Sequence, residues 1–142
     1  MEWYQETLTI ASSGGRSILI SEQVLAACPT IAKIKIGFLH LFLRHTSASL
    51  SINENADPAV RRDLDMALSH IVPESLDYYH TAEGKDDMPA HVKSALLGIS
   101  LQVPIVDGRL ALGTWQGIYL CEHRAKSHNR EIVCITYGST NH

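Results

Sequence analysis

Hydrophobic and polar residues alternate along several short stretches of the chain with the period of two that is typical of β-strands. A serine- and glycine-rich turn separates the first two of these stretches. In the most apolar stretch, the alternation puts Leu39, Leu41, Leu43 and His45 on one face. His45 is therefore expected to end a buried row. The predicted strands are residues 3–10, 16–20, 34–45, 99–105 and 132–137, with a short strand around Leu50 and Ile52.

Two other stretches repeat apolar residues with the 3.6-residue period of an amphipathic helix. The first begins at Asp57-Pro58 and ends at Pro73, and the second begins at Pro89 and stops at Gly98. A short helix starting at residue 21 precedes both. The predicted buried faces are Val60, Leu64, Ala67, Leu68 and Ile71 in the first helix, and Met88, Val92, Ala95, Leu96 and Ile99 in the second.

These elements predict a single α+β domain over residues 1–142, mainly an antiparallel β-sheet sandwich with two to three packed helices. Asp107-Gly108 is a strong hairpin signal. A long returning strand is expected over residues 110–123, in which Gly113 and Gly117 indicate a bulge or the close approach of another backbone or a ligand. The charged residues assigned to the solvent side of the first long helix are Arg61, Arg62, Asp63 and Asp65.

Composition then limits the class of protein. A chain of 142 residues with 45% hydrophobic content can form one domain with a sizeable core. The formal net charge of -3 gives no electrostatic support for a nucleic-acid or anionic-membrane partner. Three cysteines without CxxC spacing argue against a disulfide framework and a thiolate zinc site. With no signal-peptide pattern and no apolar run that could span a bilayer, a cytoplasmic protein is expected.

The densest polar chemistry lies in residues 80–91, which hold two histidines and three carboxylates. His91 falls about one turn inside the second helix and borders its apolar face, so it and His80 could converge on a metal. The competing interpretation is that Asp86 or Asp87 caps the helix, while His80 is solvated and His91 packs beside the core. On this segment alone the second interpretation is favoured.

A second polar group lies between the short strand and the first long helix. Asn53, Glu54 and Asn55 stand next to a helix N-terminus, where backbone donors favour an anion. Because a carboxylate-rich group would be an unusual site for an anion, Glu54 is expected either to cap the helix or to face a metal. No GxSxG, P-loop, GxGxxG or HExxH motif is present, so histidine, carboxylate and amide chemistry remain.

Three long motifs, HTSASLSINENADP at 45–58, EGKDDMPAHVK at 83–93 and GRLALGTWQGIYLCEHR at 108–124, together resemble the YjbQ family. Members of that family are often labelled secondary thiamine-phosphate synthases. The resemblance covers nearly the whole chain, and three motifs in the right order are far more specific than one short pattern. Small departures occur at Ser47, where the family often has threonine, and at Asp86 and Asp87, where many relatives carry asparagine.

The resemblance implies a mainly antiparallel β fold, a homotrimer and a metal-linked histidine site. The implied metal ligands are His45, His80 and His91. The implied catalytic residues are Glu54, Glu83 and Glu122. The implied substrate-binding residues are Thr46, Ser47, Asn55, Trp115, Gln116 and Arg124. The other histidines, expected to be surface or packing residues, are His40, His70, His123, His128 and His142.

Three imidazoles suit zinc with one coordination position left open, as in catalytic sites. Calcium or magnesium comes second, because these ions would take the oxygens of Glu54, Glu83, Asp86 and Asp87. The family label implies that a pyrimidine pyrophosphate is joined to a thiazole phosphate, either as the main reaction or as a side activity of an enzyme with another main role. Such a reaction needs cations for the leaving pyrophosphate. The alternatives are metal-assisted hydrolysis of a small phosphorylated or acyl metabolite, and a non-enzymatic metal- or ligand-binding trimer. The nearby basic candidates are Arg44, Lys85 and Arg124.

Overall fold

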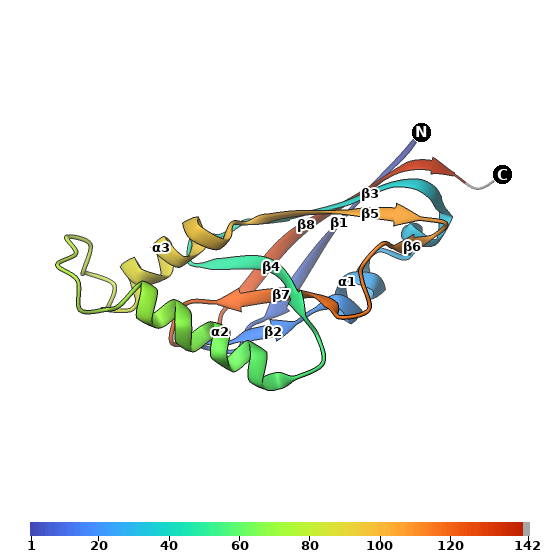
Figure 1. Cartoon of the computed structure of the whole chain (residues 1–142). Helices are drawn as coiled ribbons and strands as arrows, with labels where there is room; N and C mark the ends of the chain where they lie inside the picture. The colour runs from blue at the N-terminus through green and yellow to red at the C-terminus, as the bar shows by residue number, and fades with distance from the viewer. Residues whose placement is uncertain (141–142) are drawn as a thin grey trace.

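Two antiparallel sheets form the protein, which is described for residues 1–140 by a computed structural model (Figure 1). The strands are β1 (Glu2–Ala11), β2 (Ser17–Leu19), β3 (Ile34–Leu43), β4 (Ala48–Glu54), β5 (Ser100–Val106), β6 (Arg109–Leu110), β7 (Gln116–Glu122) and β8 (Asn129–Thr140). The helices are α1 (Ser21–Ala27), α2 (Pro58–Ile71), α3 (Asp87–Leu97) and the 3-10 helix η1 (Pro29–Lys33). One sheet has the order β1-β8-β3-β5-β6 and the other β2-β7-β4. The predicted α+β class is confirmed.

The hydrophobic core lies between the two sheets. The predicted row of Leu39, Leu41 and Leu43 on β3 is fully buried. It belongs to the same core cluster as Leu50 of β4 and Leu120 of β7, which come from the smaller sheet. Burying side chains of this size stabilises the fold by roughly 1.5–3 kcal/mol each. The period of two therefore identified the inner face of β3 correctly.

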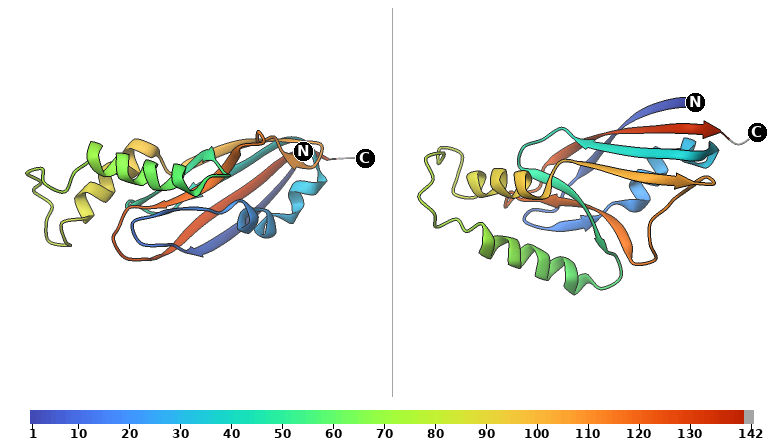
Figure 2. Two further views of the ribbon diagram at one scale, coloured as in Figure 1. Left: turned by 60° about the horizontal axis from the view of Figure 1, so that its bottom comes forward. Right: turned by 45° about the horizontal axis from the view of Figure 1, so that its top comes forward.

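Helix α2 begins where the sequence predicts, but its burial differs. The Asp57 side chain accepts a hydrogen bond from the backbone N–H of Ala59 at 2.9 Å, and Pro58 occupies the first turn. None of its described residues is fully buried, and Ile71 of the predicted inner face is 68% exposed. The helix runs along one side of the smaller sheet with no further layer over it (Figure 2). Val60, Leu64 and Leu68 of the predicted inner face are half-buried, and the rest of that face is exposed. Among the described residues, no helix has the length and apolar sequence needed to cross a bilayer.

Helix α3 ends at Gly98 as predicted, with φ of 95° at that residue. Its buried face is different from the predicted one, because Asp87, Ala90 and Ser94 point inward while Leu96 is 60% exposed. Small side chains let the helix lie close to β4, and the backbone N–H of Leu50 donates to the Gly98 carbonyl at 3.1 Å. The predicted apolar face is therefore split, because Met88 and Val92 are half-buried whereas Leu96 is exposed.

The chain after β5 also differs from the prediction. Asp107 and Gly108 form the predicted hairpin turn, with φ of 48° and 78°, and β5 pairs with β6. The predicted long strand over residues 110–123 is wrong, because β6 ends at Leu110 and the chain crosses to the other sheet before β7 begins. A Cβ placed on Gly117 would lie 2.9 Å from the Cβ of Asn55. The close approach predicted at Gly117 therefore occurs within the chain.

Candidate metal centre

Three potential metal ligands meet at the start of α3. His80, Asp87 and His91 each offer one ligand atom, and these atoms all lie within 4.8 Å of one another. Oδ2 of Asp87 lies 2.7 Å from Nε2 of His80 and 3.2 Å from Nε2 of His91. Both imidazoles thus turn the same ring nitrogen toward one carboxylate oxygen.

The helix and the loop before it position these side chains. Asp87 and His91 are four residues apart on α3, so they lie on the same face one turn apart. His80 comes from the loop that joins α2 to α3 (Figure 1). Nδ1 of His91 lies 2.7 Å from the backbone oxygen of Thr46. Since a carbonyl can only accept, Nδ1 carries the proton in neutral His91, and its Nε2 lone pair is available to a metal.

The Asp87 carboxylate is buried and held in place by Arg124. Nη1 of Arg124 donates to Oδ1 of Asp87 at 2.8 Å, and its Nε donates to Asp86 at 3.0 Å. Burial alone would raise the pKa of Asp87, but the hydrogen bond from His80 and the electrostatic influence of His91 and Arg124 outweigh it. The pKa of Asp87 therefore lies below its usual value, so the side chain is an anion at neutral pH.

The third predicted ligand, His45, lies outside this cluster. Its Nε2 accepts a hydrogen bond from the backbone N–H of Glu131 at 2.8 Å. His45, Thr46 and His91 nevertheless line one open pocket of about 590 Å³, with Ala95 as part of its apolar wall. Burial and the charge of Arg130 lower the pKa of His45. The structure thus brings two predicted ligands together and places the third in an adjoining pocket.

The other predicted polar residues form a separate group at the turn before α2. The Glu54 carboxylate accepts from the backbone N–H groups of Ala56 at 3.1 Å and Asp57 at 3.0 Å, both in the turn before the first helical residue. The Asn55 side chain donates to the backbone oxygens of Thr114 and Gln116 at 3.2 and 3.1 Å.

Helix α2 separates this turn from the loop that carries His80 (Figure 1). Its 14 residues span about 20 Å at 1.5 Å per residue. The Gln116 side chain accepts from the backbone N–H of Gly113 at 2.8 Å, and Trp115 is 65% exposed. Within one chain, the group around Glu54, Asn55, Trp115 and Gln116 is therefore remote from the His80, Asp87 and His91 cluster.

Two more predicted residues, Glu122 and Ser47, belong to a buried ionic network. Arg130 donates from Nε to Glu122 at 2.8 Å and from Nη2 to the Ser47 hydroxyl at 3.0 Å. Burial alone would raise the pKa of Glu122, but hydrogen bonds from Arg130 and Ser12 outweigh it and hold the pKa below its usual value. Glu83, in contrast, is exposed, and its backbone oxygen accepts from Arg124 at 3.0 Å. A catalytic role for Glu83 or Glu122 stays a prediction.

A buried contact between Ser49 and His123 was not predicted as a pair. The Ser49 hydroxyl and Nε2 of His123 form a hydrogen bond of 2.8 Å. Burial, reinforced by the charge of Lys93, lowers the pKa of His123 to about 4. His123 is thus a neutral packing histidine, as expected, whereas His142 lies outside the described residues. Asp87 could have been found from its spacing of four from His91, which fits one face of a helix, but no sequence signal points to the distant partner of His123.

The depressed pKa of His123 predicts that acidification destabilises the fold. In the unfolded chain a histidine has a pKa of about 6.5, so between pH 6.5 and 4 only the unfolded state takes up this proton. The free energy of unfolding should fall over that window by up to roughly 3 kcal/mol from this group. Urea unfolding of the wild type and of His123→Gln between pH 7 and 4 checks this. The variant should lose less stability on acidification than the wild type or a His128→Gln control. If the free energy of unfolding falls equally with pH in all three proteins, the prediction is contradicted.

Comparison with known proteins identifies similar chains along nearly the whole length. A family model described as UPF0047 protein YjbQ-like matches residues 6–139. The UPF0047 protein YjbQ of Escherichia coli is 45% identical over 136 residues, which cover 96% of this chain and 99% of that protein. The UPF0047 protein sll1880 of Synechocystis sp. is 48% identical over 136 residues, covering 95% and 92%.

Solved structures with the same fold also match. A protein of the yjbq/upf0047 family from Clostridium acetobutylicum is 36% identical, with a TM-score of 0.80 over 95% of this chain and 99% of its own. A YbjQ-like protein from Sulfolobus solfataricus has a TM-score of 0.86 over 97% and 99%, at 23% identity, and shows likeness of fold alone. The names of these relatives state a family but no reaction. The reaction of this chain must therefore be inferred from the geometry of its own side chains.

Proposed function

The chain belongs to the YjbQ-like UPF0047 family, and we propose that it is a metal-dependent enzyme acting on a phosphorylated small molecule. The convergence of His80, Asp87 and His91 on one point carries this proposal. Two imidazoles and one carboxylate with open positions suit zinc or a similar transition metal better than calcium or magnesium, which prefer more oxygen ligands. A metal bound there would supply Lewis acidity toward a phosphate or carbonyl oxygen.

The surroundings of the three side chains fit such an ion. Metal-bound histidines usually donate their second ring N–H to a carbonyl or carboxylate, as His91 does to Thr46. Asp87 is kept ionised and immobile by Arg124. The adjoining pocket of about 590 Å³ is large enough for a small metabolite, and His45 on its wall could exchange a proton with a bound substrate through Nδ1, the ring nitrogen that does not accept from Glu131.

Thiamine-phosphate synthase-like transfer is the reaction that the family resemblance favours, and metal-assisted hydrolysis is the second candidate. One observation favours hydrolysis. The basic side chains near the cluster are already paired, Arg124 with Asp86 and Asp87, and Lys85 with Glu74 at 4.0 Å. A leaving pyrophosphate would therefore find few free cations beside this cluster.

An assay of purified protein, loaded with zinc or treated with chelator, tests the proposal. The two phosphorylated thiamine precursors should yield thiamine phosphate and pyrophosphate only with the metal-loaded protein. Release of phosphate or acid from single metabolites, without joining, would select hydrolysis. If neither reaction depends on added metal over a panel of phosphorylated and acyl metabolites, the enzyme proposal is wrong and the binding-protein alternative is favoured.

We propose further that the protein is a homotrimer in which a neighbouring subunit completes each site. An apolar face of the larger sheet is exposed, and on it the rings of Trp3 and Tyr137 stack at 4.4 Å beside Phe38. The group around Glu54 and Trp115, remote from the histidines within one chain, would meet them only across subunits.

The trimer predicts a mass close to three times the 15.7 kDa of one chain in sedimentation equilibrium at micromolar concentration. Burial of the apolar sheet face supplies the driving force. Replacing Phe38 with Lys should shift the equilibrium to smaller species, whereas Lys33→Glu, a charge change outside that face, should not. A wild-type monomer would overturn the shared-site proposal.

A further inference from the structure

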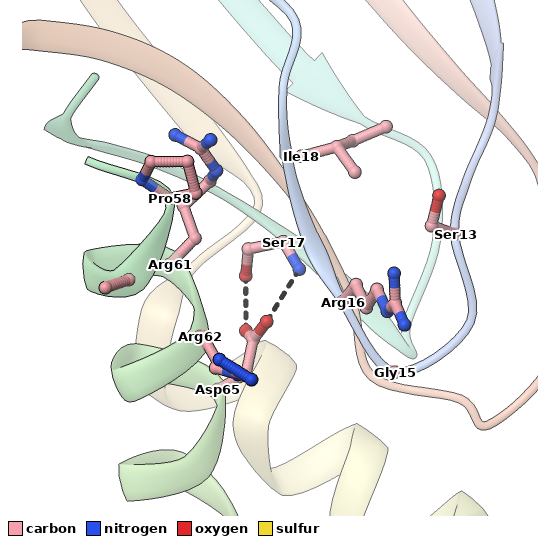
Figure 3. Close-up of a pocket in the computed structure, with 10 residues that line it drawn as sticks. Ser13, Gly15, Arg16, Ser17, Ile18, Pro58, Arg61, Arg62 and Asp65 are labelled. Carbon is pink, nitrogen blue, oxygen red and sulfur yellow. Dashed lines mark hydrogen bonds between the residues drawn. The ribbon is translucent and has the colours of Figure 1, made fainter. Parts of the chain in front are cut away.

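A pocket of about 660 Å³ lies between α2 and the turn that leads into β2 (Figure 3). Arg61, Arg62 and Asp65 line it from the helix, and Arg16 lines it from the opposite side. Arg61 and Asp65 are half-buried, so the assignment of both to the solvent side of the helix is wrong. The pocket is separate from the histidine cluster, none of whose members lines it.

The lining carries an excess of positive charge. Three arginines and one aspartate are the charged residues of the lining, although the whole chain has a formal net charge of -3. Both Asp65 oxygens accept from Ser17, at 2.9 Å from its backbone N–H and at 2.6 Å from its hydroxyl (Figure 3). Within the part of the chain that the structure describes, no ion pair joins Arg16, Arg61 or Arg62 to a carboxylate.

Arg61 has an unsatisfied group at this pocket. Its Nη1 is buried and has no hydrogen-bond partner among the described residues. Leaving a buried donor of a charged group unpaired is costly, more so than for a neutral donor. The Arg61 guanidinium therefore keeps hydrogen-bonding capacity that the described residues leave unused. The nearby helix amides are not the donors, because the Ala59 N–H already donates to Asp57 and Pro58 has none.

The two walls of the pocket are fixed before any ligand arrives. The Arg16 backbone N–H donates to Ser13 at 3.1 Å, and the Arg16 carbonyl accepts from Glu122 at 3.1 Å. Gly15, at φ of 64°, makes the turn between them. The Asp65 and Ser17 contacts join α2 to β2 across the pocket floor. Because these walls are already in place, their backbone loses little conformational entropy on binding.

We propose that this pocket binds a phosphate-bearing small molecule. Guanidinium groups match phosphate oxygens with paired hydrogen bonds, and several of them suit a ligand with more than one negative charge. Ile18, Pro58 and Ala59 form an apolar wall for the organic part of the ligand. The pocket volume lies in the range of small-molecule sites. This site is independent of the proposed metal chemistry, because it uses none of the same side chains.

Isothermal titration calorimetry of the full chain with inorganic pyrophosphate at low ionic strength tests the proposal. We expect saturable binding of one pyrophosphate per chain. Arg61→Gln and Arg16→Gln, which remove donors from opposite walls, should each weaken binding by about tenfold or more. Arg109→Gln makes the same charge change at an exposed position on β6 and should leave binding unchanged. His91→Ala should also bind normally, which separates this site from the metal cluster.

Several outcomes would overturn the proposal. They are the absence of saturable binding, a weakening of binding by Arg109→Gln equal to that by Arg61→Gln, loss of binding in His91→Ala, and tighter binding of malonate than of pyrophosphate.

A folding defect is recognised by the melting temperature. Because the Nη1 group of Arg61 is unsatisfied, Arg61→Met should melt no lower than the wild type while losing pyrophosphate binding. If Arg61→Met folds and still binds as the wild type does, the guanidinium is not part of the site.

Discussion

Replacing His91 with alanine is expected to remove almost all bound metal from the purified protein. His91 presents Nε2 to the same point as His80 and Asp87, and no other described side chain offers a ligand atom within that cluster. Loss of a residue that only orients a metal ligand costs about 10–100-fold in affinity. Loss of one of three direct ligands should therefore cost more than about 100-fold, and the same is expected for His80→Ala and Asp87→Asn.

Elemental analysis of protein prepared without chelator measures this directly. The wild type should carry about one zinc-like ion per chain, because one cluster of three ligands accepts one ion. His128→Ala is the matched control, since it removes an exposed imidazole outside the cluster. His45→Ala separates the two ligand sets. If it loses the metal while Asp87→Asn keeps it, the site centres on His45, as the family resemblance implies. A metal-free wild type, with activity unaffected by added metal, would refute the metal centre altogether.

Replacing Arg130 with methionine is expected to destabilise the protein more than any surface substitution. Arg130 and Glu122 are 3% and 2% exposed, and their ion pair lies in the interior. Removing the guanidinium leaves a buried carboxylate without its countercharge, which costs about 3–5 kcal/mol. For a chain of this length, the melting temperature should fall by about 10 °C or more. Because the pKa of Glu122 lies below its usual value, the stabilisation is present at neutral pH and is lost as the pH falls through that pKa.

Differential scanning calorimetry of three variants tests the explanation. Arg44→Met breaks a surface pair with Glu131, whose side chains are 58% and 46% exposed, so it should cost less than about 1 kcal/mol. A double variant, Glu122→Leu with Arg130→Met, removes both charges and should recover much of the loss, since no charge is then left buried alone. If Arg130→Met melts within about 2 °C of the wild type, the pair does not stabilise the fold in this way.

Much of the fold could be predicted because the local pattern reports local geometry. Leu39, Leu41 and Leu43 alternate with exposed residues, and a strand with that alternation can bury only one face. The Asp57-Pro58 start of α2 is equally local, since an aspartate side chain caps the helix amides of its own segment. The Asp107-Gly108 turn depends only on residues that tolerate positive φ.

The prediction failed where a second element decides the outcome. Leu96 of α3 is exposed because the small residues Ala90 and Ser94 form the face that packs closely on β4, and the helical period does not show which side the sheet will cover. The strand expected over residues 110–123 is broken because the chain must leave one sheet and join the other after Leu110. Neither choice is visible in a window of a few residues.

The candidate site divides in the same way. The sequence by itself determined that a helix begins between His80 and His91, because both histidines lie in one segment of twelve residues that contains the helix start. Only the tertiary structure decided that Asp87 stands between them, that His45 turns to the Glu131 amide, and that Arg16 and Arg61 share a pocket. The physical reason is that spacing along a helix or strand fixes the direction of a side chain relative to its own backbone. Its partners depend on how distant elements pack around the common core.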